Sequence, residues 1–156
     1  MKNKETVLPA PVLIVEDEAM IRSRLDLILS ELGYSQDMLI FAKNLAEAMQ
    51  IIASQPISLA LVDLGLPDGN GITLIEKLRG IDESALILVI SAWSTQQSLF
   101  ASIKAGANGY VLKERDDAEV LMSIRSILRG GAPIDPFIAR EILNQISTSN
   151  TPKLSV

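Results

Sequence analysis

Charged and hydroxyl side chains stand at the ends of four apolar runs in this sequence. The runs cover residues 12–15, 58–62, 85–90 and 109–112, and the side chains that follow them belong to Glu16 and Asp17, Asp63, Ser91, and Lys113. If the runs are parallel strands, their carboxyl ends share one edge of a sheet, which is where ligands and chemistry gather. We therefore expect acids, a hydroxyl and an ammonium to converge on one small pocket.

The chemistry open to such a pocket is narrow, because the chain contains neither histidine nor cysteine. Disulfides, imidazole bases and imidazole or thiolate metal ligands are excluded, which leaves carboxylates, hydroxyls and lysine. Asp63 is the most informative of these, since the turn-forming stretch 65–71 follows it at once. A charged group at the end of a buried strand costs free energy unless it is used or paired.

Strand and helix patterns alternate along the first 130 residues. Near-continuous apolar runs predict strands, and apolar residues at helical spacing, such as Leu121, Ile124 and Leu128, predict helices. The expected strand–helix pairs are 11–15 with 19–32, 38–41 with 44–53, 58–63 with 72–78, 85–90 with 95–105, and 109–112 with 118–128. Glycines are expected to end four of the helices, at Gly33, Gly80, Gly106 and Gly130. Five such units predict an α/β fold, a doubly wound parallel sheet with helices on both faces.

The pattern changes beyond residue 130. Asp135 is a good helix cap, and Pro136 suits the first helical position. Isoleucines then recur every four residues to Ile146, so we expect a C-terminal helix within 131–147. Residues 148–156 are polar, contain a proline and are expected to form a linker, and residues 1–10 a flexible lead.

Composition limits the classes of function. The net charge of -5 argues against a nucleic-acid-binding surface on this chain, because affinity for phosphate backbones rests largely on lysine and arginine. No apolar run reaches the ~18 residues of a membrane span, and the first residues lack a signal-peptide pattern. We expect a cytoplasmic protein that does not contact a membrane.

The order of these residues resembles the receiver domain of bacterial two-component response regulators. The matching features are the acids after the first strand, Asp63 with Pro67 and Gly71 behind it, Ser91–Ala92 after the fourth strand, and Lys113 after the fifth. The resemblance covers about residues 12–129 and assigns a receiver domain to residues 11–130. It implies a five-stranded, flavodoxin-like sheet of order 2-1-3-4-5 and a phosphoacceptor, not an enzyme acting on a separate substrate.

The resemblance also implies how phosphoryl transfer would occur. Asp63 would be the nucleophile, taking a phosphoryl group from a histidine kinase or a phosphotransfer protein. Asp17, Asp63 and the carbonyl of Gly65 would form an all-oxygen site suited to Mg²⁺, and Glu16 would help through a water molecule. Lys113 and the metal would then neutralise the phosphoryl oxygens.

Hydrogen-bond donors complete the implied site. The backbone N–H groups of Leu64 and Ala92 and the hydroxyl of Ser91 would donate to the phosphoryl oxygens. Ser91 would also act as a switch, because its movement toward the phosphoryl group would let Tyr110 turn from an exposed to a buried position. Trp93 has no role in this interpretation.

One residue departs from the pattern of most receivers. They place a proline after the lysine and use a cis peptide bond there, whereas this chain has Glu114. A cis bond before a residue other than proline costs ~3 kcal/mol. Receivers of one subfamily, the NarL/LuxR type, often lack this proline too, so the departure leaves the resemblance intact.

The C-terminal part resembles the NarL/LuxR-type subfamily. The segments that carry this likeness are 106–113, 130–136 and 138–140. In that group a helix-turn-helix domain follows, often opening with Leu-Ser, as Leu154 and Ser155 would here. The resemblance implies that DNA is bound only through an effector domain outside this chain. Such domains bind paired half-sites on DNA, and paired half-sites match the symmetry of a two-fold protein dimer. A phosphorylation-dependent homodimer would use the helices at 19–32 and 118–128, or those at 95–105 and 118–128.

Two other classes of function compete with this hypothesis. A flavodoxin-like enzyme, flavin-binding or a phosphatase, is disfavoured because no glycine-rich or Ser/Thr-rich phosphate loop follows the first strand. An unphosphorylated interaction module with the same fold is the other alternative. The complete set of pocket residues argues against it, and a phosphorylation assay distinguishes the two.

Overall fold

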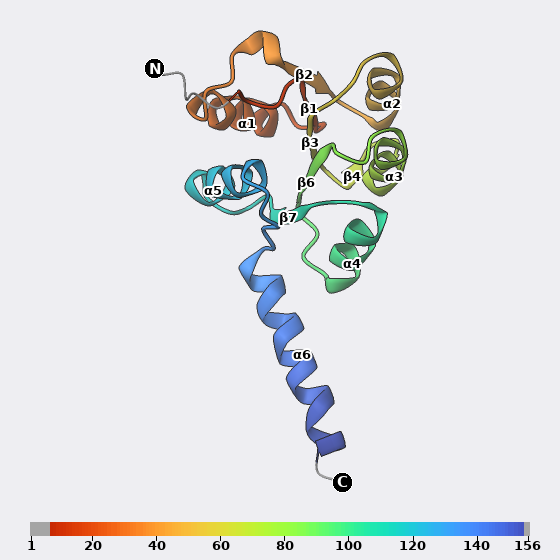
Figure 1. Ribbon diagram of the computed structural model, residues 1–156, viewed down its shortest axis with the longest axis vertical. Helices are drawn as coiled ribbons and strands as arrows, with labels where there is room; N and C mark the ends of the chain where they lie inside the picture. Colours follow the sequence, from red (N-terminus) through yellow and green to blue (C-terminus); the bar gives the residue numbers. More distant parts are fainter. Residues whose placement is uncertain (1–6, 155–156) are drawn as a thin grey trace.

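A five-stranded parallel sheet organises the chain, seen here in a computed structural model that describes residues 7–154, with side chains for residues 7–147 (Figure 1). In spatial order the strands are β2 (Leu39–Ala42), β1 (Val12–Val15), β3 (Leu59–Val62), β6 (Leu86–Ser91) and β7 (Gly109–Leu112). Since β6 and β7 are the fourth and fifth strands of this sheet along the chain, the expected order is confirmed. The strand order reverses next to β1, so the carboxyl ends of β1 and β3 flank the crevice where such sheets bind ligands.

Helices cover both faces of the sheet. They are α1 (Ala19–Glu31), α2 (Leu45–Ser54), α3 (Gly71–Ile81), α4 (Gln96–Ala105), α5 (Asp117–Leu128) and α6 (Pro136–Leu154), with a short 3-10 helix, η2 (Gln36–Met38), before β2. Figure 1 shows α1 and α5 on one side of the sheet and α2, α3 and α4 on the other. Helix α6 extends away from the body of the domain beyond α4.

Alternation along the strands divides the core in two. Leu13 and Val15 of β1 contribute to the core under α2, α3 and α4, whereas Val12 and Ile14 contribute to the core under α1 and α5. All four residues are buried, as a sheet covered on both faces requires. The buried sheet therefore provides a rigid base for the residues at its carboxyl edge.

Short polar side chains begin several helices where the sequence changes from strand to helix. The side chain of Asn44 caps α2 by accepting a hydrogen bond from the N–H of Glu47. Thr95 and Asp116 cap α4 and α5 in the same way. These caps fix the points at which the chain leaves the loops at the carboxyl edge.

Three of the four expected glycine stops are confirmed and one is wrong. Gly33, Gly106 and Gly130 have positive φ angles of 111°, 124° and 89° just beyond α1, α4 and α5. Gly80 lies inside α3, which continues to Ile81. Its φ is not positive, so it continues the helix instead of forming a left-handed stop.

The turn-forming stretch after Asp63 contains a small hairpin that the sequence analysis missed. Strands β4 (Gly65–Leu66) and β5 (Gly69–Asn70) pair antiparallel and lead directly into α3. Gly71 begins α3 against the strand end, where an added Cβ would lie 2.4 Å from the carbonyl oxygen of Asp63. Only glycine fits there, and its presence lets α3 start directly behind Asp63.

Helix α6 is longer than predicted. The expected linker at residues 148–156 is helical as far as Leu154, while Ser155 and the first six residues of the expected lead lie outside the described residues. Serine, threonine and asparagine lower helix propensity by no more than ~0.7 kcal/mol each relative to alanine, which does not end a helix already begun. The prediction gave these polar residues too much weight, and Pro152, which disfavours a helix interior by ~3 kcal/mol, lies only two residues before the helix ends.

The segment before α6 attaches to the sheet. Ile134 forms a parallel bridge with Tyr110 of β7, and Ile138 in the first turn of α6 is fully buried in the core under α4. The start of α6 is therefore part of the domain. No helix within residues 7–154 is long and apolar enough to cross a membrane.

Candidate functional site

The ammonium of Lys113 lies among three carboxylates at the carboxyl edge of the sheet. Its Nζ is 3.0 Å from Oδ2 of Asp63, 3.0 Å from Oε1 of Glu16 and 3.3 Å from Oε1 of Glu18. Glu16 and Asp63 are buried, with exposed fractions of 2% and 5%, whereas Glu18 is exposed. A half-buried cation thus joins two buried anions that come from different strands.

Backbone hydrogen bonds between neighbouring strands position these side chains. The N–H of Asp63 donates to the carbonyl of Val15 (3.0 Å), and the N–H of Lys113 donates to the carbonyl of Ser91 (2.8 Å). Each functional residue is the first one beyond its strand, where the parallel ladder still fixes the backbone. Strands β1, β3 and β7 therefore deliver Glu16, Asp63 and Lys113 to the same point.

The pKa directions reflect a site that is rich in buried negative charge. Burial raises the pKa of Glu16, and the nearby charge of Asp63 adds to this effect against the hydrogen bonds from Lys113 and the N–H of Glu18. Burial lowers the pKa of Lys113, but its hydrogen bonds to Glu16 and Asp63 outweigh burial, and the pKa is raised overall. The lysine is therefore charged whenever its partners are.

The acids also fit a divalent cation. Carboxylate oxygens of Glu16, Asp17 and Asp63 lie within 4.8 Å of one another. This set offers only oxygen ligands, which suits Mg²⁺. Asp17 is exposed, so the candidate ligands range from the buried strand ends to the solvent.

The residues that follow Asp63 contact its carboxylate and the ring of Trp93. The N–H of Gly65 donates to Oδ1 of Asp63 at 3.3 Å, and Leu64 between them is buried. The ring of Trp93 packs against Gly65, where an added Cβ would lie 3.2 Å from Cζ2 of the indole. Sequence reasoning assigned no role to Trp93, and no pattern in the sequence places its ring over this loop.

Ser91 and Tyr110 meet at the backbone of Trp93. The Ser91 hydroxyl accepts a hydrogen bond from the N–H of Trp93 (3.1 Å), and the Tyr110 hydroxyl donates to the carbonyl of Trp93 (2.6 Å). Ser91 and Tyr110 are fully buried, while Ala92 is exposed on the loop between β6 and α4. Tyr110 thus occupies the buried one of the two positions expected for it.

The peptide bond between Lys113 and Glu114 is trans, since the cis bond among the described residues joins Ala10 and Pro11. Lys113 therefore reaches Asp63 without the cis bond of most receivers. Arg24 of α1 holds this loop by hydrogen bonds to the carbonyls of Lys113 and Arg115 and by an ion pair with Asp117. The sequence analysis missed Arg24, because only the fold brings α1 beside this loop.

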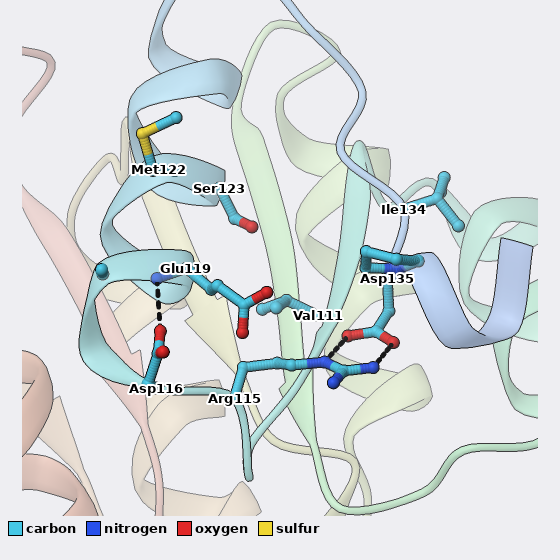
Figure 2. Close-up of a pocket in the computed structure, with 10 residues that line it drawn as sticks. Val111, Arg115, Asp116, Glu119, Met122, Ser123, Ile134 and Asp135 are labelled. Carbon is cyan, nitrogen blue, oxygen red and sulfur yellow. Dashed lines mark hydrogen bonds and ion pairs between the residues drawn. The ribbon is translucent and has the colours of Figure 1, made fainter.

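Arg115, which is part of the same loop, connects it to Asp135 at the start of α6. Figure 2 shows the guanidinium of Arg115 meeting the carboxylate of Asp135 through two parallel contacts, with N–O distances of 2.9 and 2.7 Å. Asp135 is 1% exposed, and it also accepts from the N–H of Phe137 in α6 (3.1 Å). The sequence predicted Asp135 as a helix cap, which is confirmed, but not this ion pair.

A comparison with known protein families identifies the family of this chain. The family described as "Response regulator receiver domain" matches residues 12–125, which is most of the chain and includes all the strands of the main sheet. The chain belongs to the response regulator receiver family. The residues matched run from the first strand to the middle of α5, so they contain the carboxylates and the lysine of the site.

Relatives of this receiver include proteins of Salmonella typhimurium and Staphylococcus epidermidis. The Fimbriae Z protein of Salmonella typhimurium is 30% identical over 145 residues, which cover 93% of this chain and 67% of that protein. The oxygen regulatory protein NreC of Staphylococcus epidermidis is 26% identical over 148 residues. These cover 92% of this chain and 66% of NreC, so the chain spans about two thirds of the length of these relatives.

Solved structures agree with the fold and the family. A two-component response regulator of the LuxR family from Aurantimonas sp. SI85-9A1 is 27% identical, with a TM-score of 0.74 over 89% of this chain and 99% of that one. The receiver thus resembles a LuxR-type protein both in sequence and in fold, as its C-terminal segments indicate. The beryllofluoride-activated NtrC4 receiver domain dimer is 28% identical, with a TM-score of 0.68 over 76% of this chain and 96% of that one.

Tyr110 supplies a test of the packing beside the site. Burial raises its pKa above the ordinary value of 10.0, so the neutral phenol stabilises the fold below pH 10 and this contribution is lost as the pH rises through the raised value. Tyr34→Phe leaves Tyr110 as the single tyrosine, and its absorbance titration should be shifted to higher pH than that of a free tyrosine. The free energy of unfolding should fall over the same pH range, and less so in Tyr110→Phe. A Tyr110 that titrates at the ordinary tyrosine pKa while the protein is still folded would contradict this.

Proposed function

We propose that Asp63 of this receiver accepts a phosphoryl group from a histidine kinase or a phosphotransfer protein. The observation that carries the proposal is the contact of Lys113 with Asp63 at 3.0 Å inside a cluster of acids. A buried carboxylate that faces a fixed ammonium has an oxygen available as nucleophile, and a positive charge is already in place for the incoming group. The acyl phosphate on Asp63 would be the signalling state.

Phosphoryl transfer on this chain requires charge compensation more than covalent chemistry. An oxygen of Asp63 attacks the phosphorus in line with the departing histidine nitrogen of the partner, and the charge spreads over the equatorial oxygens. Lys113 stabilises these oxygens, while the N–H groups of Leu64 and Ala92 and the Ser91 hydroxyl donate to them. No other substrate is consumed, so the chain acts as a phosphoacceptor and not as an enzyme in the ordinary sense.

Mg²⁺ would bind through Asp17 and Asp63, with the carbonyl of Gly65 as a further ligand and Glu16 contributing through water. The proximity of the three carboxylates supports this, since hard cations prefer several oxygen ligands at once. When bound, the metal would neutralise phosphoryl oxygens and bring them close to Asp63. Lys113 shares Glu16 and Asp63 with this site, so the two cations would bind the same acids from different sides.

We propose that Ser91 and Tyr110 transmit the phosphorylated state. Their shared contact with the backbone of Trp93 supports this role, because a Ser91 hydroxyl drawn to the phosphoryl group would release the N–H of Trp93. The carbonyl of the same residue holds Tyr110. A change at Asp63 would then alter the loop before α4.

The output we propose is transcriptional and lies outside this chain. The likeness to LuxR-type proteins supports an effector domain that binds DNA, whereas the net charge of -5 gives this chain no comparable surface. The receiver would act in the cytoplasm, where a kinase presents phosphohistidine. An unphosphorylated interaction module remains the alternative, and the following experiment distinguishes the two.

A small phosphodonor with Mg²⁺ should place one phosphoryl group on this chain, at Asp63. Intact-mass analysis should show a single addition that is lost in Asp63→Asn. Asp68→Asn is the matched control, because Asp68 is an exposed acid on the same loop. A phosphoryl group that persists in Asp63→Asn would reject the assignment, and an unmodified wild-type chain would favour the interaction module.

Asp17→Asn should weaken Mg²⁺ binding by at least roughly tenfold, because the site loses a direct carboxylate ligand. Trp93 is the only tryptophan and packs on Gly65, so its fluorescence reports binding. Glu18→Gln is the control, since this exposed acid is outside the proposed ligand set and should change the affinity by no more than about threefold. Equal losses in the two variants would show general electrostatics instead of coordination.

Phosphorylation should also promote a homodimer through α1 and α5 or through α4 and α5. Exposed apolar residues are present on all three of these helices: Leu27 of α1 is 71% exposed, Phe100 of α4 54% and Met122 of α5 61%. Sedimentation with beryllofluoride should show association that Leu27→Glu abolishes if α1 takes part, or Phe100→Glu if α4 does. A monomer at every concentration would reject dimerisation and leave release of the effector domain as the proposed output.

A further inference from the structure

Asp135 connects the loop of Lys113 to the start of α6. One of its oxygens, Oδ1, accepts from the N–H of Leu112 (3.2 Å) and from Nε of Arg115 (2.9 Å). The other, Oδ2, accepts from Nη2 of Arg115 (2.7 Å) and from the N–H of Phe137 (3.1 Å). A single buried carboxylate therefore contacts the residue before Lys113, the residue two positions after it, and the first turn of α6.

The backbone strengthens this connection. The N–H of Tyr110 donates to the carbonyl of Pro133, and the N–H of Asp135 donates to the carbonyl of Tyr110, both at 2.8 Å. The segment before α6 is thus bonded to β7 by a single parallel bridge. Ile138 then anchors the helix in the core under α4. Helix α6 has its position set by β7 and by the loop that carries Lys113.

Electrostatics make the pair of Arg115 and Asp135 strong. Burial raises the pKa of Asp135, but the hydrogen bonds from Arg115 and from the N–H of Leu112 outweigh it, and the pKa is lowered overall. A bidentate contact between a guanidinium and a carboxylate fixes direction as well as distance. The carboxylate is therefore ionised at neutral pH and ties Arg115 to a defined position beside α6.

From this geometry we infer that Arg115 and Asp135 are positioning residues that couple the occupancy of the Lys113 site to the attachment of α6. The inference rests on the proposed phosphorylation of Asp63. It adds a route of transmission that leaves the site through the loop after β7, separate from the one through Ser91 and Tyr110.

A charge change at Asp63 would act directly on this route. Lys113 now shares its ammonium among Glu16, Glu18 and Asp63. A phosphoryl group on Asp63 would draw the ammonium away from the two glutamates and shift the loop that follows Lys113. The contact of Arg115 with Asp135 would then lengthen.

A pocket beside the pair gives it room to move. A pocket of about 490 Å³ lies between α5 and the segment before α6, lined on its walls by Met122 and Ile134 beside Arg115 and Asp135 (Figure 2). On the opposite side of the loop, Arg24 holds the carbonyls of Lys113 and Arg115 to α1. A displaced loop would therefore change its contacts with α6 more readily than those with α1.

Hydrogen exchange of α6 in the full chain tests the inference. The chain is treated with a small phosphodonor and Mg²⁺, phosphoryl content is read by intact mass, and deuterium uptake is followed over residues 136–147. In wild type, phosphorylation should speed exchange in the first turns of α6. Asp135→Asn keeps an oxygen that can cap α6 but weakens the contact with Arg115, and its α6 should exchange roughly tenfold faster already without phosphate.

The decisive readout is the difference that phosphorylation makes. In Asp135→Asn and in Arg115→Met this difference should largely disappear while phosphoryl incorporation stays at the wild-type level. Arg125→Met, which removes an exposed arginine from α5, should behave as wild type in both respects. A purely structural pair would speed exchange in both states and leave the phosphorylation-dependent difference intact.

The outcomes separate this inference from the proposed function. A phosphorylated wild-type chain whose α6 exchange does not change, or variants that keep the full difference, would overturn the coupling and leave phosphorylation of Asp63 standing. A wild-type chain that takes up no phosphoryl group would overturn both.

Discussion

The contact of Lys113 with Glu16 and Asp63 is the constraint on which the rest of the site depends. Two buried carboxylates from neighbouring strands would repel each other, and a buried charge without a partner costs several kcal/mol. The ammonium offsets that repulsion and holds the two carboxylates close together. The same arrangement leaves the site with an excess of negative charge that a divalent cation can neutralise. The stability of the acid cluster and the proposed acceptance of a phosphoryl group would thus have one cause.

The sheet and the loops at its carboxyl edge hold the residues of this contact in place. Parallel strands end at one edge, and their hydrogen-bond ladder fixes the first residue beyond each strand to within the precision of the sheet. Gly71 lets α3 begin directly behind Asp63, and Arg24 holds the backbone of Lys113 from α1. The loops at this edge are therefore held by the buried core on one side and by side-chain contacts on the other.

Strand residues were predictable because both faces of the sheet are covered, which makes each strand an uninterrupted apolar run. The meeting of Glu16, Asp63 and Lys113 followed from their places at strand ends, given that the strands are parallel. The roles proposed for Leu64, Gly65 and Ala92 depend on backbone groups, which every residue carries, so side-chain identity gives no signal for them.

Contacts between distant side chains were not predictable. Asp135 and Arg115 are 20 residues apart, and nothing in their spacing indicates an ion pair. The same holds for Arg24 with the loop of Lys113, and for the ring of Trp93 over Gly65. Local signals failed in a different way at the end of α6, where helix propensity was too weak a guide to where the helix ends.

A structure of the chain with Mg²⁺ and beryllofluoride tests the central claim most directly. The account predicts beryllium bonded to an oxygen of Asp63, a metal ion bound by Asp17 and Asp63, and the Nζ of Lys113 moved from Glu16 to a fluoride. Beryllofluoride bound elsewhere, or a Lys113 that stays on Glu16 while Asp63 carries the group, would contradict it.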